Sequence, residues 1–213
     1  MNNNKLVDTN AILETMSLLS FYAPLIVSIS ILILSIFSGS IEKGLFFIFW
    51  IFIITSIRPF VVNRLFAVND IFNNSQCYLG QIYETKTSTY STFVLWFTLF
   101  YFICPMIIIG TQSNTNIINY GVLWFFIFYI VFDVYIKNAF KCINSIKTLL
   151  IDSLLGSSLG ALIAFTCYNS PIKSYLFINE LNSNKEVCSM PNKQQFKCSV
   201  YKNGEIVSSS VTM

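Results

Sequence analysis

GLFFIFWIFIITSIRPFVV, residues 44–62, is the stretch that decides the fold. It holds 19 residues, and Arg58 is the only charged one. A helix rises about 1.5 Å per residue, so such a run reaches nearly across the roughly 30 Å hydrocarbon core of a bilayer. This length and composition are typical of a transmembrane helix. We therefore expect an integral membrane protein.

Four more apolar runs flank this stretch. With it they predict an all-α membrane protein of about five transmembrane helices. Prolines inside three of the five runs are compatible with spanning, because neighbouring helices can satisfy the carbonyls that a proline frees. The expected organisation is a polar N-terminal segment 1–15, a helical bundle 16–170 and a small tail 171–213. The predicted spans are residues 16–37, 44–62, 91–110, 118–136 and 149–168.

Composition supports the membrane prediction and argues against several classes of function. Only 11% of residues are charged, against about 25% in an ordinary soluble domain, and 54% are hydrophobic. The net charge of +3 is small and does not indicate nucleic-acid binding, which usually needs a dense basic face. The chain has no histidine, which removes the commonest general base and metal ligand. P-loops, HExxH and nucleophile elbows are also absent, so we expect no enzyme, no metal and no cofactor.

Lysine and arginine placement predicts the orientation. With five spans, the N-terminus and the 63–90 and 137–148 loops share one side, and the two short loops on the other side hold only Lys43. Because basic residues concentrate on the cytoplasmic side, we expect a cytoplasmic N-terminus and a lumenal or external tail. The basic residues of the first side are Lys5, Arg64, Lys86, Lys137, Lys141 and Lys147.

The tail contains a predicted β-hairpin. FKCSVYK (196–202) and EIVS (205–208) flank Asn203-Gly204, and this dipeptide between two β-prone runs is a strong hairpin signal. Cys188 and Cys198 could form a disulfide that staples it, which would restrict the unfolded chain by roughly 2–3 kcal/mol. The alternative is two free thiols on a cytoplasmic tail. The other cysteines form no CxxC pair, so the pattern does not predict zinc.

Two patterns lie inside the predicted spans. Gly156, Gly160 and Ala164 form a stripe of small residues, which allows close helix packing in lipid. The stripe fits either self-association or packing against the protein's own spans, and the second is favoured. Arg58, Asp133 and Asp152 are charges at or near membrane depth, where charges often mark transport paths. Asp133 can instead pair with Lys137 one turn later, and Arg58 can snorkel to the interface.

The segment from Cys188 to Gly204 resembles tails of uncharacterised multi-span membrane proteins of large nucleocytoplasmic DNA viruses. The chain is also rich in Asn, Ile, Lys and Phe, as AT-rich genomes encode. The resemblance covers about thirty residues, includes no catalytic motif, and implies a virion membrane or an internal host membrane.

The sequence favours a non-enzymatic membrane scaffold whose external tail contacts another membrane or capsid protein. The alternative is a small transporter or channel that uses Asp133 or Asp152. The partners expected under the first hypothesis are the lipid bilayer, a second copy of the chain or another protein.

Overall fold

The structure is a computed structural model that describes residues 14–65, 89–113, 118–143, 145–181, 197–202 and 205–211. The chain divides into two units, Met1–Ser183 and Asn184–Met213. Most of the predicted polar segment 1–15 lies outside the described residues, as do Lys5, Lys86 and Cys188.

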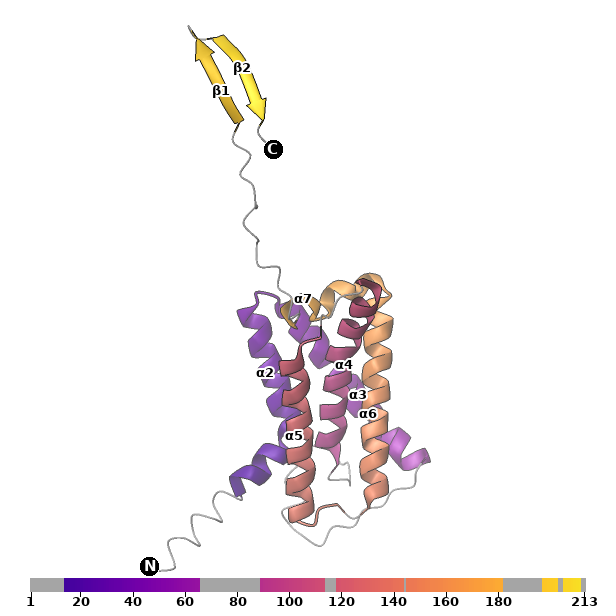
Figure 1. The fold of residues 1–213 in the computed structure, drawn as a ribbon. Coiled ribbons are helices and arrows are strands. Elements are labelled where there is room, and N and C mark those ends of the chain that lie inside the picture. The colour runs from indigo at the N-terminus through magenta and orange to yellow at the C-terminus, as the bar shows by residue number, and fades with distance from the viewer. Residues whose placement is uncertain are drawn as a thin grey trace, which may run out of the picture. The chain divides into compact units, whose positions relative to one another are not determined.

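The first unit is a bundle of apolar helices, which confirms the predicted helical character (Figure 1). Four of its helices are long and apolar enough to cross a membrane. Three of them cover a predicted span and extend beyond it by up to three residues at an end, whereas α5 starts two residues after the predicted start of its span at residue 118 and ends three residues after the predicted end. The helices are α3 (Ile41–Leu65), α4 (Tyr90–Ser113), α5 (Tyr120–Ala139) and α6 (Ile146–Tyr168).

The first predicted span, 16–37, is not one straight helix. A helical segment, Glu14–Phe21, is followed by α2 (Ala23–Phe37), and the two are bent by 68°. The break precedes Pro24, which lacks an N–H and cannot continue the hydrogen bonding of the preceding turn. Among the residues that the structure describes there are thus four candidate spans, or five if this bent pair counts as one.

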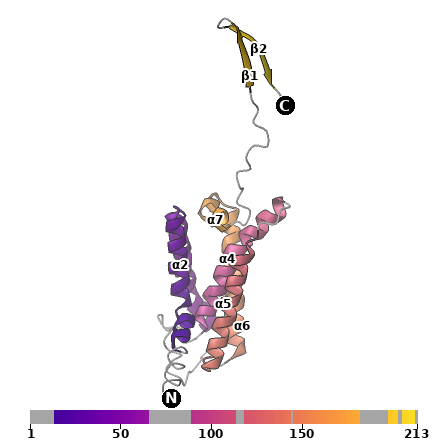
Figure 2. The same ribbon diagram turned by 60° about the vertical axis from the view of Figure 1, so that its left-hand side comes forward.

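Helix α4 is the centre of the bundle. It packs most extensively against α6 and also contacts α5 and α2, and Figure 2 shows it among these helices. Helix α3 reaches it through large rings, since Phe47 lies 5.4 Å from Tyr101 and 5.8 Å from Phe102 between centroids. The turn between α2 and α3 uses Gly39 at φ +68°, a conformation that glycine adopts without strain.

A short cap follows α6 and closes one end of the bundle. It consists of the 3₁₀ helix η2 (Pro171–Tyr175) and α7 (Ile178–Leu181). Leu176 and Phe177 are buried in the core, where Phe177 meets Phe102 edge to face. Lys43 and Glu180 form an ion pair at 2.6 Å. The division after Ser183 therefore differs from the predicted start of the tail at residue 171, because two apolar residues bind this segment to the bundle.

The second unit contains two antiparallel strands, β1 (Lys197–Lys202) and β2 (Glu205–Val211). Lys202 pairs with Glu205 and Lys197 pairs with Val211, with a register shift between Val200 and Tyr201. Asn203 and Gly204 lie outside the described residues, so the type of turn stays a prediction.

Candidate functional site

Asp133 and Lys137 form an ion pair inside the bundle. They lie one turn apart on α5, and Lys137 Nζ donates to Asp133 Oδ2 at 2.8 Å. Both side chains are fully buried. The i, i+4 spacing in the sequence suggested this pair. In the structure the two residues do form an ion pair, and it lies in the protein interior.

Three hydroxyl groups form hydrogen bonds with this ion pair. Ser20 and Ser91 donate to Asp133 Oδ1 at 2.6 and 2.8 Å, and Thr92 donates to Oδ2 at 2.7 Å. Lys137 donates in turn to the hydroxyls of Ser91 and Thr92. An ammonium has three donors and a carboxylate has about four acceptor positions. All of them are used, by groups from α4, α5 and the segment Glu14–Phe21.

Arg58 and Asp152 form a second buried ion pair, between α3 and α6. Arg58 Nε donates to Asp152 Oδ1 at 2.9 Å and Nη2 donates to Oδ2 at 2.6 Å. This two-pronged geometry is the strong form of an arginine–carboxylate contact. Thr89 also donates to Asp152 Oδ2, and the guanidinium lies 5.5 and 5.6 Å from the ring centroids of Tyr90 and Phe93.

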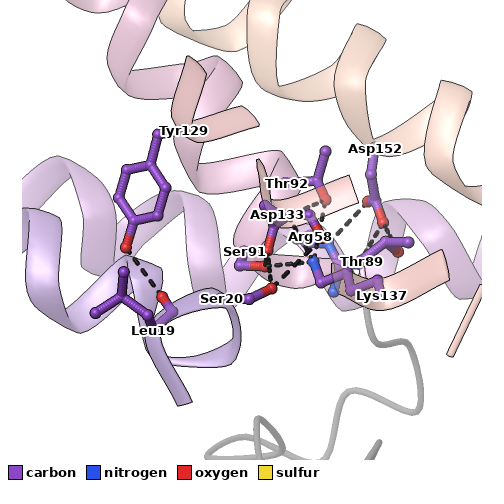
Figure 3. A network of polar contacts seen from close by, with 10 residues as sticks. All are labelled: Leu19, Ser20, Arg58, Thr89, Ser91, Thr92, Tyr129, Asp133, Lys137 and Asp152. Atoms are coloured by element: carbon purple, nitrogen blue, oxygen red, sulfur yellow. Dashed lines mark hydrogen bonds and ion pairs between the residues drawn. The ribbon is translucent and has the colours of Figure 1, made fainter. Parts of the chain in front are cut away.

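The two pairs form one polar layer (Figure 3). They are close enough that Arg58 and Asp152 act electrostatically on Lys137. Two positive and two negative charges make the layer neutral, and every helix from α3 to α6, together with Glu14–Phe21, contributes to it. We call this set the polar layer; its members are Ser20, Arg58, Thr89, Ser91, Thr92, Asp133, Lys137 and Asp152.

Close packing of α4 against α6 holds the two sides of the layer together. A Cβ added at Gly156 would overlap the carbonyl oxygen of Phe93, and one added at Gly160 would overlap that of Phe97. Ala164, one turn further along α6, is fully buried. The equal steps along both helices show that α4 and α6 run parallel. The stripe of small residues is thus used within the chain.

The cysteines are spread over different environments. Cys104 and Cys167 are free, and Cys142 is disulfide-bonded. Cys198 belongs to β1, but its side chain and Cys188 lie outside the described residues, so their disulfide stays a prediction. No group of three acidic, cysteine or histidine residues among the described residues could hold a metal ion.

An apolar cavity of about 290 Å³ lies between α2, α4 and α5. Its walls include Ile31, Phe102, Val122 and Phe126. Tyr129 also borders it, one turn from Asp133, but none of the four charged side chains of the polar layer lines it. The cavity is therefore separate from the charges that a transport path would use.

No protein-family model matches this chain, and no curated protein and no solved structure resembles it significantly.

Proposed function

We propose that this protein is a non-enzymatic, multi-pass membrane scaffold that displays residues 184–213 for contact with another protein. The finer features belong to the same proposal: five membrane crossings, a cytoplasmic N-terminus and a lumenal or external tail. The partner is another membrane or capsid protein, and the resemblance of the tail sets the proposal in a viral or virus-associated membrane.

The saturated hydrogen bonding of Asp133 and Lys137 carries this proposal. A carboxylate that binds and releases a transported ion needs a free acceptor or water at some stage of its cycle. Here each acceptor position of Asp133 faces a protein donor, and each donor of Lys137 faces a protein oxygen. Such an arrangement fixes helices relative to one another, which is what a scaffold needs.

The apolar cavity supports the same conclusion. A carrier or channel places its polar groups along the path of the transported species. The cavity between α2, α4 and α5 is lined almost entirely by apolar side chains, and the four charged side chains of the polar layer are buried and do not line it.

The experiment compares the full chain with a chain truncated after Ser183, both in their native membrane. We expect the truncated chain to insert and fold normally but to lose the neighbours that crosslink to the full chain. Loss of folding would show that the tail is structural, and an unchanged set of neighbours would show that it is not the contact surface.

A parallel measurement addresses transport by the purified chain in liposomes. The proposal predicts no proton, Na⁺ or K⁺ flux above that of protein-free liposomes. The opposite result would be a flux that the Asp133→Asn variant loses and the Lys147→Met control retains. It would contradict the scaffold proposal and support the transporter alternative. Lys147 suits the control because its side chain is exposed and outside the polar layer.

A further inference from the structure

The helical segment Glu14–Phe21 leaves the direction of α2 and has two unlike sides. It turns 68° away from α2 just before Pro24, and Figure 1 shows it diverging from the axis of α2 at the lower end of that helix. Ser17, Ser20 and Phe21 are buried, whereas Met16, Leu18 and Leu19 are 39–48% exposed. One side of the segment thus faces the protein interior, and three large apolar side chains of its other side are exposed.

The buried side is fixed to α5 and to the turn after it. Ser20 donates to Asp133, and Tyr129, one turn earlier on α5, donates its hydroxyl to the Leu19 carbonyl at 3.0 Å. The ring of Phe21 packs with Phe140 and Cys142. Three consecutive residues of the segment therefore hold it across the polar layer, as Figure 3 shows for Leu19 and Ser20.

Large apolar side chains are exposed on α2 as well. Leu25, Ile29 and Ile33 of that helix are each 47% exposed, and this is the surface that acyl chains cover if α2 stands in the membrane. Met16, Leu18 and Leu19, on the other side of the bend, are exposed to a similar extent. Because large apolar side chains are exposed both before and after the bend, lipid is the material that suits both surfaces.

Length places the segment at the membrane boundary. The 15 residues of α2 reach about 22 Å, which is short of a hydrocarbon core of roughly 30 Å. A segment of eight residues tilted by 68° adds only about 4–5 Å along the same direction. The bent pair therefore reaches about 26–27 Å along the axis of α2, close to the thickness of the hydrocarbon core. If the other end of α2 lies at one boundary, Glu14–Phe21 lies near the opposite one.

We propose that Glu14–Phe21 is an interfacial helix that binds the lipid surface and covers the polar layer. Met16, Leu18 and Leu19 insert among the acyl chains next to the headgroups, while Ser20 completes the shell of Asp133 on the other side. It follows that Asp133 and Lys137 lie at the membrane boundary and are sealed from lipid and water by this helix. The proposal is independent of the scaffold function.

The test measures the depth of Leu18. A fluorescent amino acid replaces Leu18 in the full chain, which is reconstituted with phospholipids that carry a nitroxide either near the headgroup or near the chain end. Leu18 is partly exposed, so the label disturbs little packing. Ile29 on the outer side of α2 is the matched control position.

We expect the headgroup-proximal nitroxide to quench position 18 at least about twofold more than the chain-end nitroxide, because interfacial helices lie about 5–10 Å deep. At position 29 the order should reverse. Quenching at position 18 with the same depth profile as position 29 would show that the segment crosses the hydrocarbon. Weak quenching by both lipids at position 18 would show that water or another protein covers it. Either result overturns the proposal.

Discussion

Lys137 shows how a charged residue can be kept inside an apolar bundle. Its ammonium has an acidic partner one turn away and two hydroxyls from the start of α4, so none of its three donors is left without an acceptor. A buried ion pair of this kind adds little to stability compared with apolar residues, but removing one partner is costly. The pair therefore specifies the arrangement of α4 and α5 more than it strengthens it.

This reasoning predicts the outcome of a double-mutant cycle. Asp133→Asn should destabilise the bundle by about 3–5 kcal/mol, because it leaves the ammonium of Lys137 buried without a counter-charge. Lys137→Met should cost a similar amount. The double variant should lose far less than the sum, with a coupling of at least about 2 kcal/mol. Thermal unfolding in detergent measures each term.

Lys147→Met is the control for this cycle, and its exposed side chain should change stability by less than about 0.5 kcal/mol. If the double variant loses as much stability as the two single variants together, the structural role of the pair is contradicted.

The sequence predicted half of the polar layer. The i, i+4 spacing of Asp133 and Lys137 is a local signal, and it identified their contact. Arg58 was expected to snorkel, but it is only 2% exposed and pairs with Asp152. These residues are 94 positions apart on helices that are not sequence neighbours. No local pattern shows which distant carboxylate will meet a buried arginine, and the serine and threonine partners give no signal of their own.

At the scale of elements, the contact between α4 and α6 dominates the bundle. A helix with glycine at this spacing can approach another backbone more closely than other residues allow. Gly156 and Gly160 do so against consecutive turns of α4, at Phe93 and Phe97. Because the neighbouring atoms are backbone oxygens, no side-chain rotation can relieve an added methyl group.

We therefore expect Gly160→Ala to destabilise the protein by about 1–3 kcal/mol, although alanine is the better helix former. Gly121→Ala is a matched control near the start of α5, where an added Cβ meets only the side-chain oxygen of Asn119. It should change stability by less than about 1 kcal/mol. Equal thermal unfolding of the two variants would show that α4 and α6 do not pack this closely in the membrane.

Helix positions followed from the apolar runs, but two features of the elements did not. The bend before α2 combines Pro24 with side-chain contacts to α5, and proline alone does not distinguish a kink from a tolerated residue. The cap after α6 was assigned to the tail because its composition is mixed. Only Leu176 and Phe177 enter the core, and two apolar residues are too weak a pattern to predict docking.

At the scale of the whole molecule, two signals for the orientation disagree. The lysine and arginine bias puts the 137–148 loop in the cytoplasm. Cys142 in that loop is disulfide-bonded, and disulfides persist mainly in oxidising compartments. We give the charge bias more weight, since it rests on several residues in separate parts of the chain.

Reporters at two positions test the orientation. One fused after Met213 should be lumenal or external, and one inserted beside Lys141 should be cytoplasmic. The reverse result would show that the disulfide was the better indicator. If both reporters lie on the same side, α6 does not cross the membrane, although its length and composition suit crossing.

The distance along the chain between Arg58 and Asp152 also has a consequence for biosynthesis. A ribosome that adds about 5–20 residues per second needs about 5–20 s to make the 94 residues between them. During that interval α3 already exists, but Asp152 has not yet been made. The ion pair between α3 and α6 can therefore form only after the last of the long helices has been synthesised. A nascent chain that stops before α6 lacks this contact between distant helices.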